Sequence, residues 1–270
     1  MTDHEFAALE NSEFRAMADF YRAAPEATRA AYAVDVQEVA GVTCMKSRGI
    51  EPAVMFRRAA GLGVGREASE AEAERVLAHM SAGAQRYAVP LAAHARPAAL
   101  AAWLEKRGFT RGYAWMKFSR PCHDAPHART DLEIRVAGRE LGAEFGRVVV
   151  EGFGLPAAMA PWIAALAGRQ HWVCVMAFAD GKAVGSGAVY VDGEHAWLGL
   201  GATLTSHRRL GAQNALLARR LKEAAARGAK TAVTETGERV PDKPSTSYGN
   251  ILRAGFRERY LRQNYLSPAK

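Results

Sequence analysis

The chain has 270 residues, of which 49% are hydrophobic and 24% charged, which is typical of a globular protein long enough for two domains. Its net charge of +8 is spread along the chain as single arginines and short pairs, which disfavours a nucleic-acid-binding surface. No apolar run approaches the length of a membrane span, and residues 1–14 are acidic where a signal peptide is basic and apolar, so we expect a cytoplasmic protein that binds no membrane.

The first half predicts helices and strands in alternation. Residues 69–84 are rich in alanine and glutamate and predict a helix, and RYAVPL at 86–91 predicts a strand. In the segment 103–118, WLEKRGFTRGYAWMKF, we expect a short helix that stops at Gly108 and is followed by aromatic-rich strands.

Residues 119–131 contain two prolines, mixed charge and no hydrophobic periodicity, so they predict a linker. Cys122 lies there with His123 and His127, but no second cysteine or metal-ligand spacing accompanies them, and we predict no metal site. Cys44, Cys122 and Cys174 are far apart and odd in number, which favours free thiols.

The second half begins with a predicted strand at 131–136 and two helices at 139–154 and 156–168. Three strands follow within 172–204, separated by the turn pairs Asp180 with Gly181 and Asp192 with Gly193. A loop, TSHRRLGA, then enters a helix that runs to about residue 227 and has an apolar stripe. That stripe contains Leu210, Leu217, Leu221 and Ala224.

The two halves end on the same pattern. Aligning Gly108 with Gly255 superimposes Phe109 on Phe256, and NILRAGFRERYLRQNYL at 250–266 then reads like the end of the first half. Each copy is preceded by an alanine-rich helix and a short strand, the second strand being KTAVTET at 230–236. The repetition predicts a duplicated α/β module, with residues 1–125 as one unit and 126–270 as the other.

The loop before the 212–227 helix has the properties of an anion site. Unpaired N–H groups and the positive end of the helix dipole attract negative charge. Gly211 leaves the backbone accessible, and Arg208 and Arg209 add charged donors. In the first half the corresponding helix opens with REASEAEAE, whose glutamates would repel a phosphate. We therefore expect one anion site, in the second half; the alternative is a solvated basic helix.

A three-strand meander, [R/Q]-x-x-G-x-[G/A] opening a helix, then a strand, a helix and Gly-Phe resembles the GNAT superfamily of acyl-CoA-dependent N-acyltransferases. The resemblance covers about residues 131–266 and, more loosely, the whole chain as a tandem form. It implies an α/β fold with a mixed, mostly antiparallel sheet flanked by helices. It also implies an acetyltransferase domain at 126–270 that binds acetyl-CoA, beside a degenerate module at 1–125 without a cofactor.

The resemblance also assigns cofactor-binding residues. Asn250 matches a position that often contacts the cofactor, and its counterpart in the first half is Trp103. The pantetheine arm would pair with the strand at Ala202, Thr203 and Leu204, and the pyrophosphate would lie on Arg208, Arg209, Leu210, Gly211, Ala212 and Gln213. Gln213 replaces the usual glycine or alanine, and Ile251 stands where many members have a tyrosine.

The implied reaction is transfer of an acetyl group to a primary amine, of a small molecule or a protein, by direct transfer. A base must take the amine proton, and the candidates are Glu194, His195 and Glu151. Tyr248 is the candidate acid for the leaving thiolate, and a backbone N–H near a strand bulge at 202–204 is expected to stabilise the tetrahedral intermediate. The alternative is a catalytically silent acyl-CoA-binding regulatory module, and a homodimer is left open.

Overall fold

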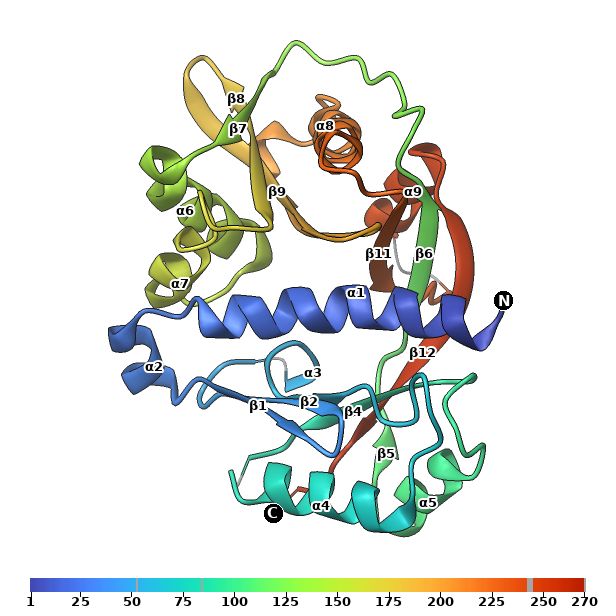
Figure 1. Ribbon diagram of the computed structural model, residues 1–270. Coiled ribbons are helices and arrows are strands. Elements are labelled where there is room, and N and C mark those ends of the chain that lie inside the picture. The colour runs from blue at the N-terminus through green and yellow to red at the C-terminus, as the bar shows by residue number, and fades with distance from the viewer. Residues whose placement is uncertain (52, 84, 242–244, 270) are drawn as a thin grey trace.

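The computed structural model describes residues 1–51, 53–83, 85–241 and 245–269, and Figure 1 shows its helices and strands. The first half begins with the long helix α1 and continues through the other elements in the order that follows. They are α1 (Asp3–Arg22), α2 (Glu26–Tyr32), β1 (Asp35–Val39), β2 (Val42–Lys46), α3 (Ala53–Phe56), β3 (Arg58–Ala60), α4 (Glu70–Ser81), β4 (Ala88–Ala92), α5 (Leu100–Lys106), β5 (Thr110–Arg111) and β6 (Trp115–Pro121).

The second half is connected to β6 by an extended segment and contains a longer antiparallel meander. Its elements are β7 (Glu133–Ala137), the 3-10 turn η1 (Arg139–Leu141), α6 (Gly142–Phe153), η2 (Ala157–Met159), α7 (Ala160–Ala164), β8 (Trp172–Ala179), β9 (Lys182–Asp192), β10 (His195–Thr203), η3 (Thr205–His207), α8 (Ala212–Ala226), β11 (Thr231–Gly237), α9 (Thr246–Arg253) and β12 (Arg257–Leu266). The predicted elements of both halves are present, although residues 119–121 belong to β6 rather than to a linker.

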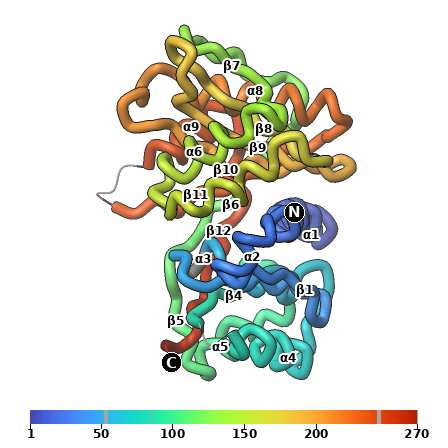
Figure 2. Tube along the Cα trace, turned by 90° about the vertical axis from the view of Figure 1, so that its left-hand side faces the viewer, coloured from blue at the N-terminus to red at the C-terminus, as the bar shows by residue number. Residues whose placement is uncertain are grey.

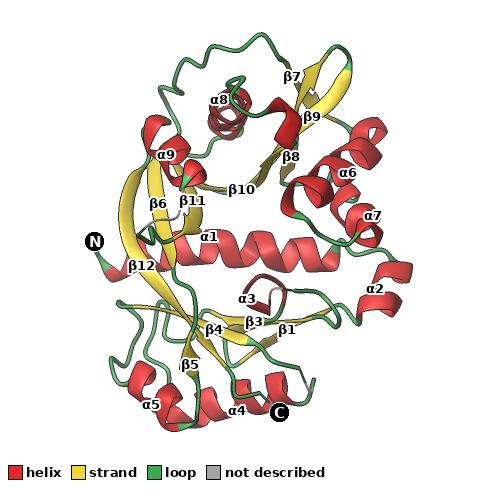
Figure 3. Ribbon diagram, turned by 180° about the vertical axis from the view of Figure 1, so that it is seen from behind, coloured by secondary structure: helices red, strands yellow, loops and turns green. Residues whose placement is uncertain are grey.

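The strands form one mixed, mostly antiparallel sheet in the order β1-β2-β3-β4-β12-β6-β11-β10-β9-β8-β7, with β5 beside β12. Among the described strands, only β3 with β4 and β10 with β11 pair in parallel, once in each half. Helices cover the sheet, as Figure 3 shows from behind. The predicted fold class is confirmed.

The two halves exchange their last strands. β6, at the end of the first half, pairs with β11 of the second, while β12, at the end of the second half, pairs with β4 of the first. β6 and β12 also pair with each other, so they join the two parts of the sheet. The division of the sequence into units 1–125 and 126–270 stays a prediction. In the sheet, the strands of each half pair with the last strand of the other half.

The repeated helix–glycine–phenylalanine pattern has the same geometry in both copies. Gly108 and Gly255 both have φ of +81°, the left-handed conformation that ends a helix. The N–H of Phe109 donates to Leu104 O (3.1 Å), and that of Phe256 donates to Ile251 O (3.3 Å). Both phenylalanines are buried, which confirms the alignment of the two copies at this point.

Helix α1 lies between the two parts of the molecule (Figures 1 and 2). Thr2 caps its first turn, in a capping box with Glu5. Its buried face includes Phe14, Met17 and Phe20, which join a core with residues of both halves. The same helix buries two carboxylates, Glu10 and Glu13, which become important at the site.

Candidate functional site

A cleft opens between β10 and β11. The two strands pair only from His195 with Thr231 to Trp197 with Val233. Beyond these pairs, the Thr234 hydroxyl donates to Leu198 O across the gap (2.8 Å). The register of β10 with β9 shifts between Gly199 and Ala202, and Leu200 has φ of +54°. The bulge therefore lies at 200–201, slightly before the predicted 202–204.

A cavity of about 280 Å³ occupies this opening and continues to α1. The end of the cavity near α8 and α9 contains two of the predicted cofactor-binding residues, Gln213 and Asn250. It is also lined by Leu200, Gly201, Leu217, Ser247 and Ile251. Its other end is formed by both halves and is mainly apolar, with Met17, Phe20, Met55, Phe56, Trp115, Phe153, Leu155, Ile163 and Trp197. Such a space suits a small ligand with an apolar body.

The N-terminal end of α8 has no side-chain cap. Arg208 and Arg209 are exposed beside it, and in the described part of the chain neither forms an ion pair. Gly211 has φ of +80°, and a Cβ there would lie 2.5 Å from Arg129 O. Glycine is thus required by the linker that packs on this loop, while the N–H groups of the helix end remain open to an anion.

The corresponding end of α4 is closed by its own side chains. Ser69 caps the helix in a capping box with Glu72, and Arg66 pairs with the same carboxylate (2.8 Å). Trp103 Nε1 donates to Glu70 (2.7 Å). Asn250, the counterpart of Trp103 in the second half, borders the cavity instead. The two halves therefore differ physically at this position: one helix end is open and the other is already neutralised.

The predicted cofactor residues lie at the end of β10, in the following loop, at the start of α8 and in α9. Gln213 Nε2 donates to Thr203 Oγ1 (2.8 Å), and both Gln213 and Asn250 border the cavity. Ala202 is buried and Leu204 donates its N–H to Val184 O (2.9 Å). The remaining residues, Arg208, Arg209, Leu210, Gly211 and Ala212, make up the loop and the first residue of α8. Leu210 is 50% exposed and does not belong to the predicted buried stripe, because the helix begins after it.

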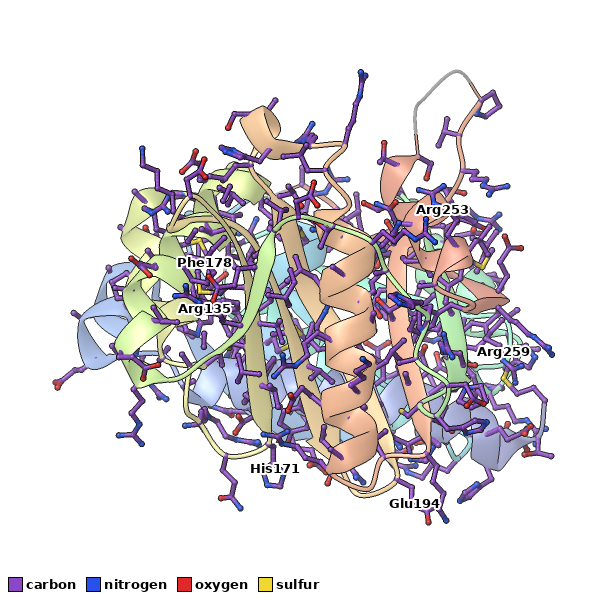
Figure 4. All side chains as sticks on the ribbon, turned by 90° about the horizontal axis from the view of Figure 1, so that it is seen from above. Arg135, His171, Phe178, Glu194, Arg253 and Arg259 are labelled. Atoms are coloured by element: carbon purple, nitrogen blue, oxygen red, sulfur yellow. The ribbon has the colours of Figure 1, made fainter. Side chains whose placement is uncertain are left out.

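The predicted bases do not reach the cavity. Glu194 is exposed in the turn before β10 and pairs with Lys230, which lowers its pKa. Figure 4 shows it beside the C-terminal end of α8, away from the loop. His195 borders a different surface hollow, and burial lowers its pKa. Glu151 is exposed on α6 and pairs with Arg147 (3.1 Å). The structure does not support any of the three as the base, since none lines the cavity.

Tyr248 is also directed away from the cavity lining. Its hydroxyl donates to Glu258 (2.6 Å), and its ring packs edge-on against Phe118. Burial and this hydrogen bond raise its pKa to about 12. In this geometry Tyr248 is a packing residue, and the assignment as acid is not supported.

Sequence reasoning missed Glu235, the carboxylate of β11 that lines the cavity. Its side chain is 6% exposed and accepts hydrogen bonds from Trp197 Nε1 (3.0 Å) and Lys117 Nζ (3.1 Å). Burial raises its pKa, and the nearby Glu13 carboxylate adds to the effect. A raised pKa makes a carboxylate a better proton acceptor, so Glu235 is the strongest candidate base.

Glu235 belongs to a buried ion-pair network supplied by α1, β3, β6, β11 and β12. Glu13 accepts from Arg58 Nη1 (2.8 Å), Lys117 Nζ (2.5 Å) and Arg262 Nη1 (2.6 Å). Burial raises the pKa of Glu13, but these three cations outweigh it and hold the pKa well below its usual range. Glu10 pairs with Arg262 (3.1 Å). The network fixes one wall of the cavity where the two halves meet.

Cys44, Cys122 and Cys174 are buried free thiols. Within the described ranges, no group of three or more His, Cys, Asp or Glu side chains is arranged to hold a metal ion. In the same part of the chain, no helix is long and apolar enough to cross a membrane.

Comparisons with known proteins agree with this fold. Residues 147–247 match the sequence model of the acetyltransferase (GNAT) family. No curated protein sequence gives a significant match.

Among solved structures, a GCN5-related N-acetyltransferase from Kribbella flavida superimposes with a TM-score of 0.64 at 18% identity, over 94% of this chain and 96% of that chain. A tandem GNAT protein from the clavulanic acid biosynthesis pathway gives a TM-score of 0.60 at 16% identity, over 85% of this chain and 78% of that one. A GCN5-related N-acetyltransferase from Sphaerobacter thermophilus gives 0.57 at 16% identity, over 74% and 67%. Residues 147–247 therefore match the GNAT family model, and the chain as a whole shares its fold with these solved structures.

Proposed function

We propose that the C-terminal half binds acetyl-CoA and transfers the acetyl group directly to a primary amine held in the cavity. One observation carries the proposal: a single cavity runs from the open end of α8, at Gln213, to the buried carboxylate of Glu235. Acetyl-CoA supplies an activated thioester. Its anionic pyrophosphate requires hydrogen-bond donors, which the end of α8 offers, and the amine that attacks the thioester requires a base, which Glu235 can provide.

In this proposal the loop before α8 binds the pyrophosphate of acetyl-CoA, and the bulge in β10 orients the thioester. The open N–H groups of α8 and the side chains of Arg208 and Arg209 hold the pyrophosphate by charge-assisted hydrogen bonds. The bulge in β10 removes Leu200 and Gly201 from the pairing with β9, and both border the cavity. In this proposal a backbone N–H there donates to the thioester carbonyl oxygen, and its stabilisation of developing negative charge is a large contribution to rate.

Glu235 takes the proton of the amine, directly or through one water molecule, as the amine nitrogen forms its bond to the carbonyl carbon. The bond from that carbon to sulfur then breaks, and the thiolate leaves without a tyrosine acid. Trp197 and Lys117 orient the carboxylate through their hydrogen bonds. The apolar wall excludes water and favours the neutral amine.

A silent acyl-CoA-binding module remains the second candidate, and two observations favour it. Ile251 replaces the usual tyrosine at the cavity, and Glu235 is already paired with Lys117. Turnover separates the two: release of free thiol from acetyl-CoA that depends on an added amine supports the enzyme. Binding of acetyl-CoA without amine-dependent thiol release supports the silent module.

A further inference from the structure

The buried charges around the cavity do not balance. Among the described residues, three carboxylates and four cations either line the cavity or belong to the ion-pair network that forms its wall. The carboxylates are Glu10, Glu13 and Glu235, and the cations are Arg58, Lys117, Arg262 and Arg220. Because buried charges are normally paired, one negative charge is missing from this region.

Arg220, on α8, is the cation without a carboxylate. It is 2% exposed and borders the cavity. Nε donates to Leu216 O (3.1 Å), and Nη1 donates to Gly199 O (3.1 Å) and, more weakly, to Ala188 O (3.4 Å). No described residue accepts a hydrogen bond from its Nη2. By contrast, Arg58, Lys117 and Arg262 each contact Glu13.

The surrounding backbone makes room for this guanidinium. A Cβ on Gly187 would lie 2.7 Å from Arg220 Nε, so only glycine leaves the required space. Burial lowers the pKa of Arg220 to about 10, and the side chain still carries its charge at neutral pH. An uncompensated buried charge is costly, and such groups concentrate at sites that bind an opposite charge.

The phosphates of coenzyme A do not supply the missing charge in the proposed binding mode. Arg220 lies eight residues after Ala212, the first residue of α8, so it is roughly 12 Å along the helix from the end that would hold the pyrophosphate. The charge must therefore come from the part of the ligand that occupies the cavity beside Gly199 and Gly201.

We propose that one of the two substrates carries a carboxylate that pairs with Arg220. The inference rests on the proposed acyl transfer. The carboxylate has two chemical sources: the acceptor, as in an apolar amino acid, or the acyl chain, as in a dicarboxylic acyl thioester. The Nη2 group is available to either, and the apolar wall accommodates the rest of the acceptor.

The test compares kcat/KM for substrates that differ only by the carboxylate. The acceptor arm uses acetyl-CoA with L-phenylalanine or 2-phenylethylamine, and the acyl arm uses 2-phenylethylamine with succinyl-CoA or butyryl-CoA. We expect one arm to prefer the carboxylate by about 10²-fold or more, because a site built around a polar partner rejects the analogue that lacks it. Arg220→Met should abolish that preference, while Arg219→Met, on the neighbouring surface position, should keep it.

A binding readout separates this inference from the proposed function. The melting temperature of the full chain is measured with 3-phenylpropionate and with 3-phenylpropionamide, neither of which can be acylated. Stabilisation by the carboxylate alone, absent in Arg220→Met and retained in Arg220→Lys, supports the pairing even if no thiol is released. Equal kcat/KM within both arms, a preference that persists in Arg220→Met, or no thiol release together with no carboxylate-specific stabilisation overturns it.

Discussion

Reversing the two arginines of the α8 loop tests the proposed pyrophosphate site. Both side chains are exposed, and neither forms an ion pair in the described part of the chain, so Arg208→Glu with Arg209→Glu should change stability by no more than about 0.5 kcal/mol. Two charge-assisted hydrogen bonds at about 1.5–3 kcal/mol each correspond to a loss of roughly 10²- to 10⁴-fold in affinity for coenzyme A. Calorimetric titration with coenzyme A measures the change.

The matched control reverses two exposed lysines away from the loop, Lys106→Glu on α5 with Lys222→Glu late in α8, and so changes the net charge by the same amount. The control should bind coenzyme A almost as well as the wild type, with a difference that shrinks as salt is raised. Unchanged affinity in the arginine double variant, or an equal loss in both double variants, would refute a local site at this loop.

Four further outcomes are expected. Glu235→Gln should lower kcat by at least about 10²-fold, while the affinity for coenzyme A, measured by calorimetry, stays within about twofold. The rise of kcat/KM with pH that follows deprotonation of Glu235, whose pKa burial raises, should also be lost; wild-type turnover would exclude Glu235 as the base. Calorimetry should give one coenzyme A per chain, since Ser69 and Glu72 close the end of α4; two would show that this end opens. Tyr248→Phe should keep its turnover and lose about 1 kcal/mol of stability with the hydrogen bond to Glu258, whereas a drop of about 10²-fold in kcat would restore the tyrosine as the acid. Glu13→Gln should cost about 3–5 kcal/mol in urea unfolding, because it removes the carboxylate that Arg58 pairs with and one of the carboxylates of Lys117 and Arg262. Since the folded pKa of Glu13 is lowered, that stability is present in the wild type above about pH 4.5 and disappears as the pH falls through the lower folded value; a variant of wild-type stability would contradict this role of the network.

The sequence predicted those parts of the site that are local in the chain. The meander, the loop with Arg208 and Arg209, and the helix that ends at Gly255 are each encoded within a short window by turn residues, charge and periodicity. The arginines before one helix and the glutamates at the start of the other predict one anion site, in the second half. The structure agrees in that the N-terminal end of α8 has no side-chain cap, whereas that of α4 has one.

The catalytic side of the site could not be predicted in this way. The sequence places Glu194 and His195 at the start of a strand, but strand periodicity does not reveal which end of β10 separates from β11. Glu235, Glu13 and Arg58 are brought together from β11, α1 and β3, and their pairing depends on long-range packing. The exchange of β6 and β12 was likewise invisible, because both strands have the same local pattern in either pairing.

The most direct test of the central claim is transfer itself, measured on one sample by two products. The full chain is incubated with acetyl-CoA and a set of primary amines that includes 2-phenylethylamine and L-phenylalanine, and both free thiol and acetylated amine are quantified, the latter by mass spectrometry. We predict acetylated amine in equal amount to the thiol released, with both lost in Glu235→Gln. Coenzyme A bound at one per chain without acetylated amine from any member of the set would contradict the account and identify a silent binding module.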